Sequence, residues 1–480
     1  MRVGGIITAL LALAPLVASA PLTRRHYQEV IDGYEIGADI WKRHTAVNVT
    51  AAEFYKTPAN FTKSSKPGDL LKFEQISRAP LDLQYAIPPS LTLYRMMYVS
   101  VDINNLTVPA TGFILLPFTP AAKGLKNSSA YPTLVWTHGT AGVTRDCAPT
   151  LLRGLYYDFE GPFEFALEGY AVVAPDYAGL GSDTRFDYVA GPPHADDASY
   201  SVVAARKSPI AHLLTYEWAV IGHSEGGMAA WFTNEAEHVR PVGGFIGSVS
   251  VAPALFTSAY NGSLDYTRPN VSDGIAPVVP ASDPPPNIDP PPAPLDTGLY
   301  YLMFSIQSAA RLNKSIIPEN YLTEKGKVAY HLLEQGGCYI AGQYTTSNMT
   351  FEDLFTSNDA IEALRGPWLA RIQPGGGARK LGGPMLVIQS IDDEAVSFPA
   401  VLSAFRGNCQ AQPENQIGLH LYSELTHDGT MFGSKYDYVN FLDALFNNHT
   451  AAFPVAGKCE ETFIPSGTTS FKTYFSYELN

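Results

Sequence analysis

The stretch Trp218-Ala-Val-Ile-Gly222-His-Ser224-Glu-Gly226-Gly-Met-Ala-Ala230 determines the fold that we expect for this chain. Its first four residues are apolar and suit a buried strand, and the small residues after Gly226 suit the beginning of a helix. A serine with glycine two positions before and after it is typical of a sharp strand-to-helix turn whose strained backbone exposes the hydroxyl. The pentapeptide alone also occurs by chance as an ordinary turn. Its context between strand and helix favours a nucleophilic Ser224.

Short apolar runs recur on both sides of this turn. The runs expected to be strands are 94–102, 109–116, 133–137, 171–174, 218–221, 242–251, 385–389 and 419–422. Helices are expected between or after them, over 227–237, 400–406 and 436–446. Runs that are apolar at every position suit strands buried on both faces. The alternation predicts an α/β-hydrolase type of α/β fold, in which a mostly parallel sheet has helices on both faces.

A serine hydroxyl is a weak nucleophile until a base takes its proton. In this topology an acid follows a late strand and a histidine follows the last one. The segment Asp392-Asp393-Glu394 stands after the seventh run, and His427 stands after the eighth. We prefer Asp393 as the acid, because Val396 three residues later would anchor its loop. The competing interpretation is that these acids cap the following helix.

Two backbone N–H groups are needed to bind the oxyanion of an acyl-transfer reaction. One is expected from Glu225, the residue after the nucleophile. The other is expected from the loop 138–142, which follows the third run, and we choose Thr140 within it. The competing interpretation of this loop is a glycine-rich turn with no catalytic part.

The segment 255–382 interrupts the alternation and is expected to be an inserted, mainly helical lid. It contains helical stretches over 298–313 and 320–335, and a loop over 277–294 with nine prolines. The hydrolase core would then comprise 66–254 and 383–459. Residues 21–65 and the tail 460–480 show no clear regular pattern.

The N-terminus has the pattern of a secretory signal. Arg2, an apolar run and Ala18-Ser19-Ala20 predict a signal peptide over 1–20. Arg24-Arg25 either marks the end of a short propeptide over 21–25 or is an ordinary pair of surface residues. Sequons for N-glycosylation are also in excess of chance. They stand at Asn48, Asn60, Asn105, Asn127, Asn261, Asn270, Asn313, Asn348 and Asn448. These features predict a secreted glycoprotein with no transmembrane segment.

The chain has four cysteines, Cys147, Cys338, Cys409 and Cys459. None forms a Cys-x-x-Cys pair, so zinc and redox motifs are unsupported. In an oxidising compartment two disulfides are expected, and three connectivities are open. Sequence neighbours often share a subdomain, which favours Cys147–Cys338 and Cys409–Cys459. The competing interpretation for each cysteine is a free buried thiol.

Composition excludes several classes of function. The 480 residues include 32 basic and 46 acidic side chains, a formal net charge of −14, and 46% hydrophobic residues. The hydrophobic fraction excludes a wholly disordered chain. The acidic balance argues against nucleic-acid binding and against a polybasic lipid-binding patch. The chain has no dinucleotide fingerprint, phosphate-binding loop or His-Glu-x-x-His motif, so we expect no cofactor and no metal.

Taken together, these residues resemble a known family. The motif around Ser224, the segment Pro67–Leu71, the run Tyr94–Pro117, the turn Ala174–Gly181 and the surroundings of Asp393 and His427 are similar to the fungal secretory lipases, the lipase-A-like α/β-hydrolases. The likeness spans about residues 50–450. It implies an α/β-hydrolase core, a lid over an acyl pocket, two disulfides, a C-terminal flap and a triad of Ser224, Asp393 and His427. The family includes triacylglycerol lipases and esterases that deacetylate fungal metabolites such as trichothecenes.

The sequence therefore predicts a secreted serine carboxylic-ester hydrolase, a lipase or esterase acting on a small-molecule or lipid ester, with contact to a lipid interface. The alternatives are a deacetylase for a fungal metabolite, a peptidase or amidase on the same scaffold, and a non-catalytic binding protein that kept the fold. Apolar residues of the lid, Leu299, Leu302, Met303 and Ile306, either line the acyl pocket or pack the lid on the core.

Overall fold

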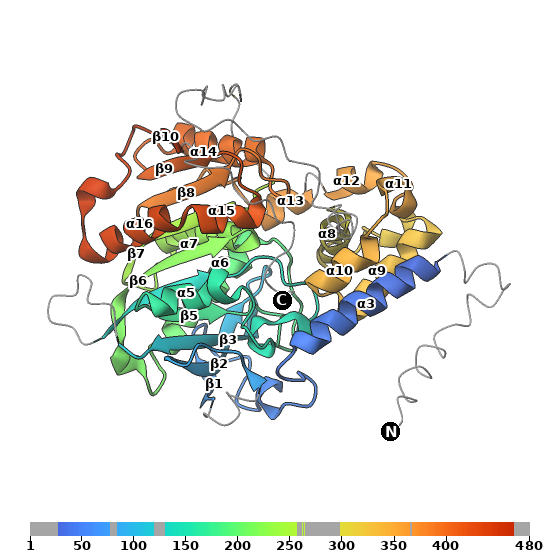
Figure 1. Ribbon diagram of the computed structural model, residues 1–480, viewed down its shortest axis with the longest axis horizontal. Helices are drawn as coiled ribbons and strands as arrows, with labels where there is room; N and C mark the ends of the chain where they lie inside the picture. Colours follow the sequence, from blue (N-terminus) through green and yellow to red (C-terminus); the bar gives the residue numbers. More distant parts are fainter. Residues whose placement is uncertain are drawn as a thin grey trace, which may run out of the picture.

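The computed structural model of the protein describes residues 27–76, 84–119, 130–256, 262, 264, 298–364 and 367–464 (Figure 1). The expected signal peptide, the propeptide and the proline-rich loop 277–294 lie outside these residues, as does the segment 465–480. Within the described part, no helix is both long and apolar enough to cross a bilayer.

Ten strands form one sheet in the described residues, in the order β1-β2-β3-β5-β4-β6-β7-β8-β9-β10. The pairs β1–β2, β2–β3 and β3–β5 are antiparallel, and every other neighbouring pair is parallel. The strands are β1 (Leu70–Gln75), β2 (Leu91–Val101), β3 (Thr107–Pro117), β4 (Tyr131–Thr137), β5 (Ala171–Pro175), β6 (Leu214–His223), β7 (Phe245–Val251), β8 (Met385–Ser390), β9 (Ile417–Tyr422) and β10 (Glu460–Ile464). This confirms the predicted mostly parallel α/β sheet.

Side-chain alternation along the strands builds a core on each face of the sheet. In β4, Trp136 joins the core cluster that contains Phe165. Val135, the residue before it, joins a second cluster that contains Ala198. Because both faces of the strand are buried, the sequence shows a continuous apolar run here rather than alternation.

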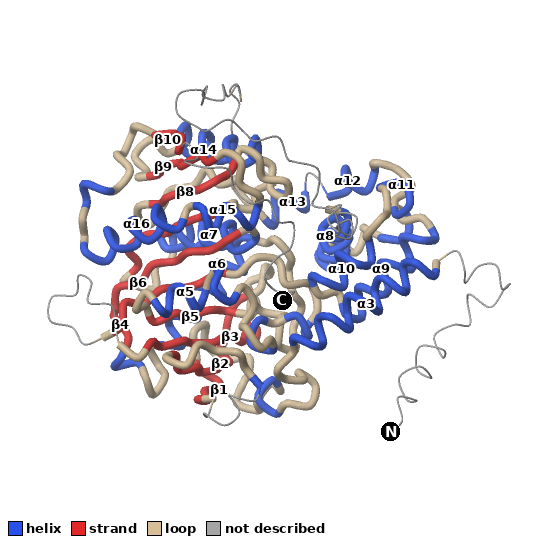
Figure 2. The backbone as a smooth tube through the Cα atoms, in the orientation of Figure 1, coloured by secondary structure: helices blue, strands red, loops and turns tan. Residues whose placement is uncertain are grey.

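Helices cover both faces (Figures 1 and 2). Phe165 belongs to α5 and Ala198 to α6, so these two helices pack on opposite faces of the sheet. The helices of the core are α5 (Pro162–Leu167), α6 (Gly191–Ala205), α7 (Glu225–Val239), α14 (Phe398–Ala411), α15 (His427–Gly433) and α16 (Lys435–Asn447).

A second group of helices stands beside the sheet, on the right in Figure 1. In the part of the chain that the structure describes, six of them lie between β7 and β8, within the predicted lid. They are α8 (Leu299–Leu312), α9 (Glu324–Gly336), α10 (Tyr339–Thr346), α11 (Phe351–Leu354), α12 (Asp359–Leu364) and α13 (Pro367–Ile372).

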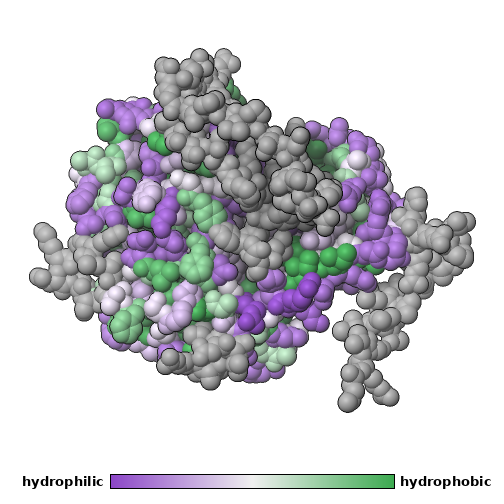
Figure 3. Space-filling model, viewed as in Figure 1, coloured by the Kyte–Doolittle hydropathy of each residue, from purple (hydrophilic) through white to green (hydrophobic). Residues whose placement is uncertain are grey.

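The long helix α3 (Gln28–His44) packs on α9 and α10 of this group. This helix lies in the segment 21–65, whose sequence shows no clear regular pattern. The buried face of α3 consists of Val30, Gly33, Gly37 and Trp41, which recur at helical spacing. Two of these four residues are glycine, so the face carries little hydrophobic signal. The opposite face is polar, and Figure 3 shows a hydrophilic stripe along the helix.

The predicted C-terminal boundary of the core is wrong by five residues. We expected the core to end at 459 and a tail without regular structure to follow. Instead Glu460–Ile464 forms β10, which extends the sheet by pairing in parallel with β9. The strand is short, and three of its five residues are exposed, so its sequence lacks the apolar run of an inner strand.

All four cysteines form disulfides, in the favoured connectivity. Cys147 pairs with Cys338 and Cys409 with Cys459, with Cα–Cα distances of 5.2 and 5.9 Å. The first bond joins the region after β4 to the turn between α9 and α10. Backbone hydrogen bonds of 2.9 Å reinforce this connection, from Tyr339 N–H to the Ala141 carbonyl and from Val143 N–H to the Gly337 carbonyl. The helical part of the segment 255–382 is therefore fastened beside the loop 138–142, and we keep the name lid for this segment.

The contact between α3 and α10 gives a test of this packing. A Cβ at position 37 would lie 2.6 Å from the Ile340 carbonyl oxygen and 2.7 Å from Ala341 Cα. We expect Gly37→Ala to lower the free energy of unfolding by about 1–3 kcal/mol, because overpacking outweighs the better helix propensity of alanine. Thermal and denaturant unfolding measure this. The control Glu35→Ala changes an exposed residue of the same helix and should stay within about 0.5 kcal/mol. Equal stability of the two variants would contradict the packing.

Candidate active site

Ser224 lies in the turn between β6 and α7, as the sequence predicts. Its backbone has φ 61° and ψ −121°, a conformation that is rare for a residue with a side chain. Such strain persists only where the surroundings enforce it, and it is common at functional sites. Because Ser224 also precedes the first turn of α7, the positive end of the helix dipole faces it.

The two glycines of the motif are required by a close approach to β4. A Cβ at Gly226 would collide with the carbonyl group of Thr137, and one at Gly222 would collide with the Thr137 hydroxyl and the Gly226 carbonyl. The Thr137 hydroxyl instead donates hydrogen bonds to the carbonyls of Ile221 (3.1 Å) and Gly226 (2.9 Å). Tight contact between the turn and β4 thus enforces the strained backbone of Ser224.

The structure brings Asp393 and His427 together. His427 Nδ1 lies 2.8 Å from Asp393 Oδ2, and both side chains are buried. The other carboxylate oxygen of Asp393 accepts hydrogen bonds from the N–H groups of Ala395 (2.9 Å) and Val396 (2.8 Å). Burial raises the pKa of Asp393, but His427 and these N–H groups outweigh it and hold the pKa below the usual value. Asp393 is therefore held as a carboxylate beside the imidazole.

His427 is poised to accept a proton at its other nitrogen. Its Nε2 atom is buried and has no hydrogen-bond partner among the described residues. Burial lowers the pKa of the imidazole, but the charge and hydrogen bond of Asp393, with Asp428 and Glu394, raise it to about 9. Asp393 thus stabilises the protonated form of His427. A buried nitrogen left without a partner is unusual and is expected to meet a reacting group.

All three acids of the segment Asp392-Asp393-Glu394 hold the loop before α15. Asp392 accepts the N–H of Glu424 (2.7 Å), and Glu394 accepts the backbone N–H of His427 (3.0 Å). The competing idea that they cap the next helix is wrong, because α14 begins after Ser397 without a side-chain cap. The cluster instead fixes the backbone that carries His427.

The two residues expected to supply the oxyanion donors come from adjacent segments. Glu225 is the first residue of α7, and Thr140 lines the same cavity as Ser224. The Thr140 hydroxyl lies 3.0 Å from the hydroxyl of Tyr188, and the Thr140 carbonyl accepts a hydrogen bond from the Tyr156 hydroxyl. Thr140 is therefore held from two sides, in the wall of the cavity that Ser224 also lines.

Ser224 opens into a cavity of about 480 Å³ between the core and the lid. Most of its lining is apolar. The core contributes Thr140, Tyr188, Ser224, Ala254, Ala395, Val396, Ser397 and Ala400, and the predicted lid contributes Leu255, Phe256, Gly298, Tyr301, Leu302, Ser305, Ile361, Leu364, Trp368 and Leu369. Of the four lid residues considered from sequence, only Leu302 lines this cavity. Met303 and Ile306 are fully buried in the core cluster, and Leu299 packs against it.

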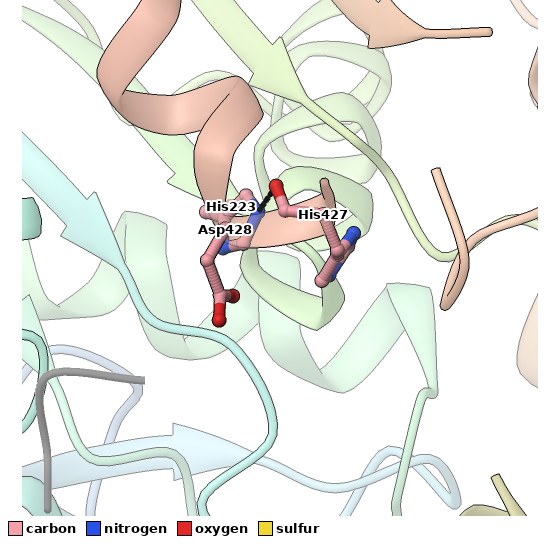
Figure 4. A group of neighbouring side chains, drawn as sticks. All are labelled: His223, His427 and Asp428. Carbon is pink, nitrogen blue, oxygen red and sulfur yellow. Dashed lines mark hydrogen bonds between the residues drawn. The ribbon is translucent and has the colours of Figure 1, made fainter. Parts of the chain in front are cut away.

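Among the described residues, one group of possible metal ligands includes His427 (Figure 4). Ligand atoms of His223, His427 and Asp428 lie within 4.8 Å of one another. However, His223 uses both ring nitrogens in hydrogen bonds, and His427 uses Nδ1 toward Asp393. These bonds favour proton transfer over metal binding at this group.

Several side chains that support the site are not predicted from the sequence. Gln389 donates a 3.0 Å hydrogen bond to Asp393, and the buried Glu225 carboxylate accepts one of 2.9 Å from Val189 N–H. His194 Nε2 lies 2.9 Å from the same carboxylate oxygen of Glu225. Gln389 could have been found from the sequence, because it is a polar residue in the apolar run of β8, just before the predicted acid. The other contacts join distant segments and leave no local pattern.

Comparisons with known proteins agree with this fold. The profile of the alpha/beta hydrolase family matches residues 134–407. Candida antarctica lipase A in its closed state has a TM-score of 0.62 at 14% sequence identity, covering 90% of this chain and 94% of the lipase. The rice cell wall degrading esterase from Xanthomonas oryzae has a TM-score of 0.52 at 15% identity, covering 80% of this chain and 98% of the esterase. No curated protein matches the chain significantly. At these identities the likeness to the solved structures concerns the fold.

The contact between Asp393 and His427 predicts a change in titration. Asp393→Asn removes the charge that stabilises the imidazolium, so His427 should lose its proton at lower pH. We expect its pKa to fall from about 9 to near or below the ordinary value of about 6.5. NMR titration of the histidine ring protons measures it. The control Asp392→Asn alters the acid that binds Glu424 N–H and should leave the His427 titration nearly unchanged. An unaltered titration in Asp393→Asn would refute the assigned pairing.

Proposed function

We propose that this chain, which belongs to the alpha/beta hydrolase family, is a serine carboxylic-ester hydrolase with Ser224, His427 and Asp393 as its catalytic triad. The observation that carries the proposal is the strained backbone of Ser224 in the wall of a mostly apolar cavity. Strain at this residue has no packing role of its own, because a glycine would adopt the same conformation at lower cost. It is explained if the hydroxyl must be presented at that point.

The reaction follows from the positions of the groups. Ser224 Oγ attacks the ester carbonyl carbon while its proton passes to Nε2 of a neutral His427. Because the pKa of His427 is about 9, the neutral fraction, and with it the rate, should increase as the pH rises toward 9. The N–H groups of Glu225 and Thr140 hold the resulting oxyanion. The intermediate collapses, and the alcohol leaves with the proton from His427. Water then attacks the acyl-enzyme by the same path and releases the carboxylic acid. Asp393 keeps the imidazole oriented and stabilises its charge.

The cavity favours an acyl group larger than acetyl. Its volume of about 480 Å³ lies within the usual range of pockets for small organic ligands, and its walls are mostly apolar. An acetyl group would leave most of that surface without contact. We therefore favour a lipase or an esterase for longer or bulkier acyl groups over a deacetylase of acetylated metabolites.

Secretion is part of the proposal. Six of the nine sequon asparagines lie in described residues, and all six are exposed: Asn48, Asn60, Asn105, Asn313, Asn348 and Asn448. Asn127, Asn261 and Asn270 lie outside the described residues. Exposure is what glycosylation requires, and two disulfides suit an oxidising compartment. The expected signal peptide agrees with both.

Replacement of the nucleophile tests the proposed function. Ser224→Ala should lower kcat for ester substrates by roughly a millionfold, because no acyl-enzyme can form. A fluorophosphonate probe should label the wild-type protein at Ser224 and fail to label the variant. Ser64→Ala changes an exposed serine and should behave as the wild type. Full activity in Ser224→Ala, or a wild-type protein that the probe does not label, would sink the proposal.

The acyl preference is tested by narrowing the cavity. With a series of esters from acetyl to oleoyl, kcat/KM should rise beyond acetyl. Leu302→Trp, which fills part of the cavity, should lower kcat/KM for the longer esters by roughly tenfold and affect acetyl esters little. Leu312→Trp, on the same helix but outside the lining, is the control. A strong acetyl preference in the wild type would instead favour the deacetylase. Rate increases at an oil–water interface would favour a lipase.

A further inference from the structure

A left-handed turn contacts residues of the candidate active site. Four consecutive residues other than glycine have positive φ: Leu155 (57°), Tyr156 (55°), Tyr157 (74°) and Asp158 (43°). Residues with a side chain adopt this region at a cost, and normally singly rather than in succession. A run of four therefore calls for a compensating role, and strained segments of this kind cluster at functional sites.

The turn directs its two tyrosines at different parts of the site. Both rings are buried, at 4% and 6% exposure for Tyr156 and Tyr157. The Tyr156 hydroxyl donates to the carbonyl of Thr140, in the loop expected to bind the oxyanion. The Tyr157 hydroxyl lies 2.9 Å from Nδ1 of His223, the residue before Ser224. A Cβ at Gly139 would collide with this hydroxyl, so the glycine makes room for it.

His223 connects Tyr157 to His427 through its second ring nitrogen. Its Nε2 lies 3.2 Å from the backbone carbonyl oxygen of His427, the dashed line in Figure 4, and the two ring centroids lie 4.4 Å apart with their planes tilted by 36°. A carbonyl can only accept, so Nε2 of His223 carries the proton. Burial and the neighbouring His427 hold the pKa of His223 well below its usual value, so the ring is neutral and Nδ1 is an acceptor. Tyr157 must then be the donor to Nδ1.

We propose that Tyr157 is a positioning residue which, through His223, fixes the first residue of α15 and so aims the imidazole of His427 at Ser224. The hydrogen bonds all run in one direction, from the Tyr157 hydroxyl to His223 and from His223 to the His427 carbonyl. The strained backbone of residues 155–158 places the hydroxyl of Tyr157 beside Nδ1 of His223. This inference rests on the proposed function, because it assigns a part in the same reaction.

The decisive variant is Tyr157→Phe, which keeps the ring and removes the hydroxyl. We expect kcat to fall roughly ten- to a hundredfold with KM within about twofold, because a misaimed base slows the chemical step without changing substrate binding. The rate at which a fluorophosphonate labels Ser224 should fall in parallel, since labelling needs the same base.

Tyr170→Phe is a matched control. Tyr170 is also buried, and its hydroxyl donates a 2.9 Å hydrogen bond to Asp443. It immediately precedes β5, at the end of the sheet opposite to the site. Both variants lose one buried hydroxyl and should show comparable decreases in Tm, but only Tyr157→Phe should lower kcat. The His223→Gln background adds a second measurement: there, Tyr157→Phe should change kcat by less than about twofold.

The outcomes are distinguishable. A wild-type protein without ester hydrolysis would overturn the proposed function and this inference with it. An active wild-type protein in which Tyr157→Phe has the kcat of Tyr170→Phe would overturn the inference alone, and so would an undiminished effect of Tyr157→Phe in the His223→Gln background. The positioning role is supported if Tyr157→Phe lowers kcat while Tyr170→Phe does not, and if Tyr157→Phe no longer lowers kcat in the His223→Gln background.

Discussion

The close contact between the serine turn and β4 is the constraint on which the rest of the structure depends. Thr137 of β4 touches the turn at both glycines, so neither Gly222 nor Gly226 can carry a side chain. That contact forces the backbone of Ser224 into a conformation with positive φ. Helix α7 then begins directly after Ser224, at the carboxyl end of β6. The hydroxyl of Ser224, which lines the cavity, and the dipole of α7 are therefore positioned by one packing contact.

Parallel strand order then assembles the remaining groups. Because the carboxyl ends of parallel strands meet at one edge, the segments after β4, β6, β8 and β9 are neighbours in space. The register aligns Ser390 at the end of β8 with Tyr422 at the end of β9, so Asp393 and His427 follow from adjacent strands. Their mutual hydrogen bond stabilises the imidazolium. The strained turn 155–158 reaches the backbone carbonyl of His427 through the hydrogen bonds of Tyr157 and His223. The lid is fastened next to Thr140 by the Cys147–Cys338 bond.

Much of this could be predicted because local patterns carry it. Every expected strand is present, and the chain order of serine, acid and histidine selected side chains that the fold brings to one edge. Where local patterns are weak, prediction failed. The glycines on the buried face of α3 hide its hydrophobic period, and the short, exposed β10 lacks the apolar run of an inner strand. The acids after β8 resembled helix caps, but they bind the His427 loop instead.

By itself, then, the sequence determined the class of fold, the serine turn, the acid and base candidates and the favoured disulfide pairing. All of these depend on spacing along the chain or on steric requirements of single residues. Only the tertiary structure decided which lid residues line the cavity, that α3 joins the lid, and that Tyr157 and His223 reach His427. These contacts join segments from about 65 to 300 residues apart, and no short-range pattern records which residues will meet once the sheet has formed.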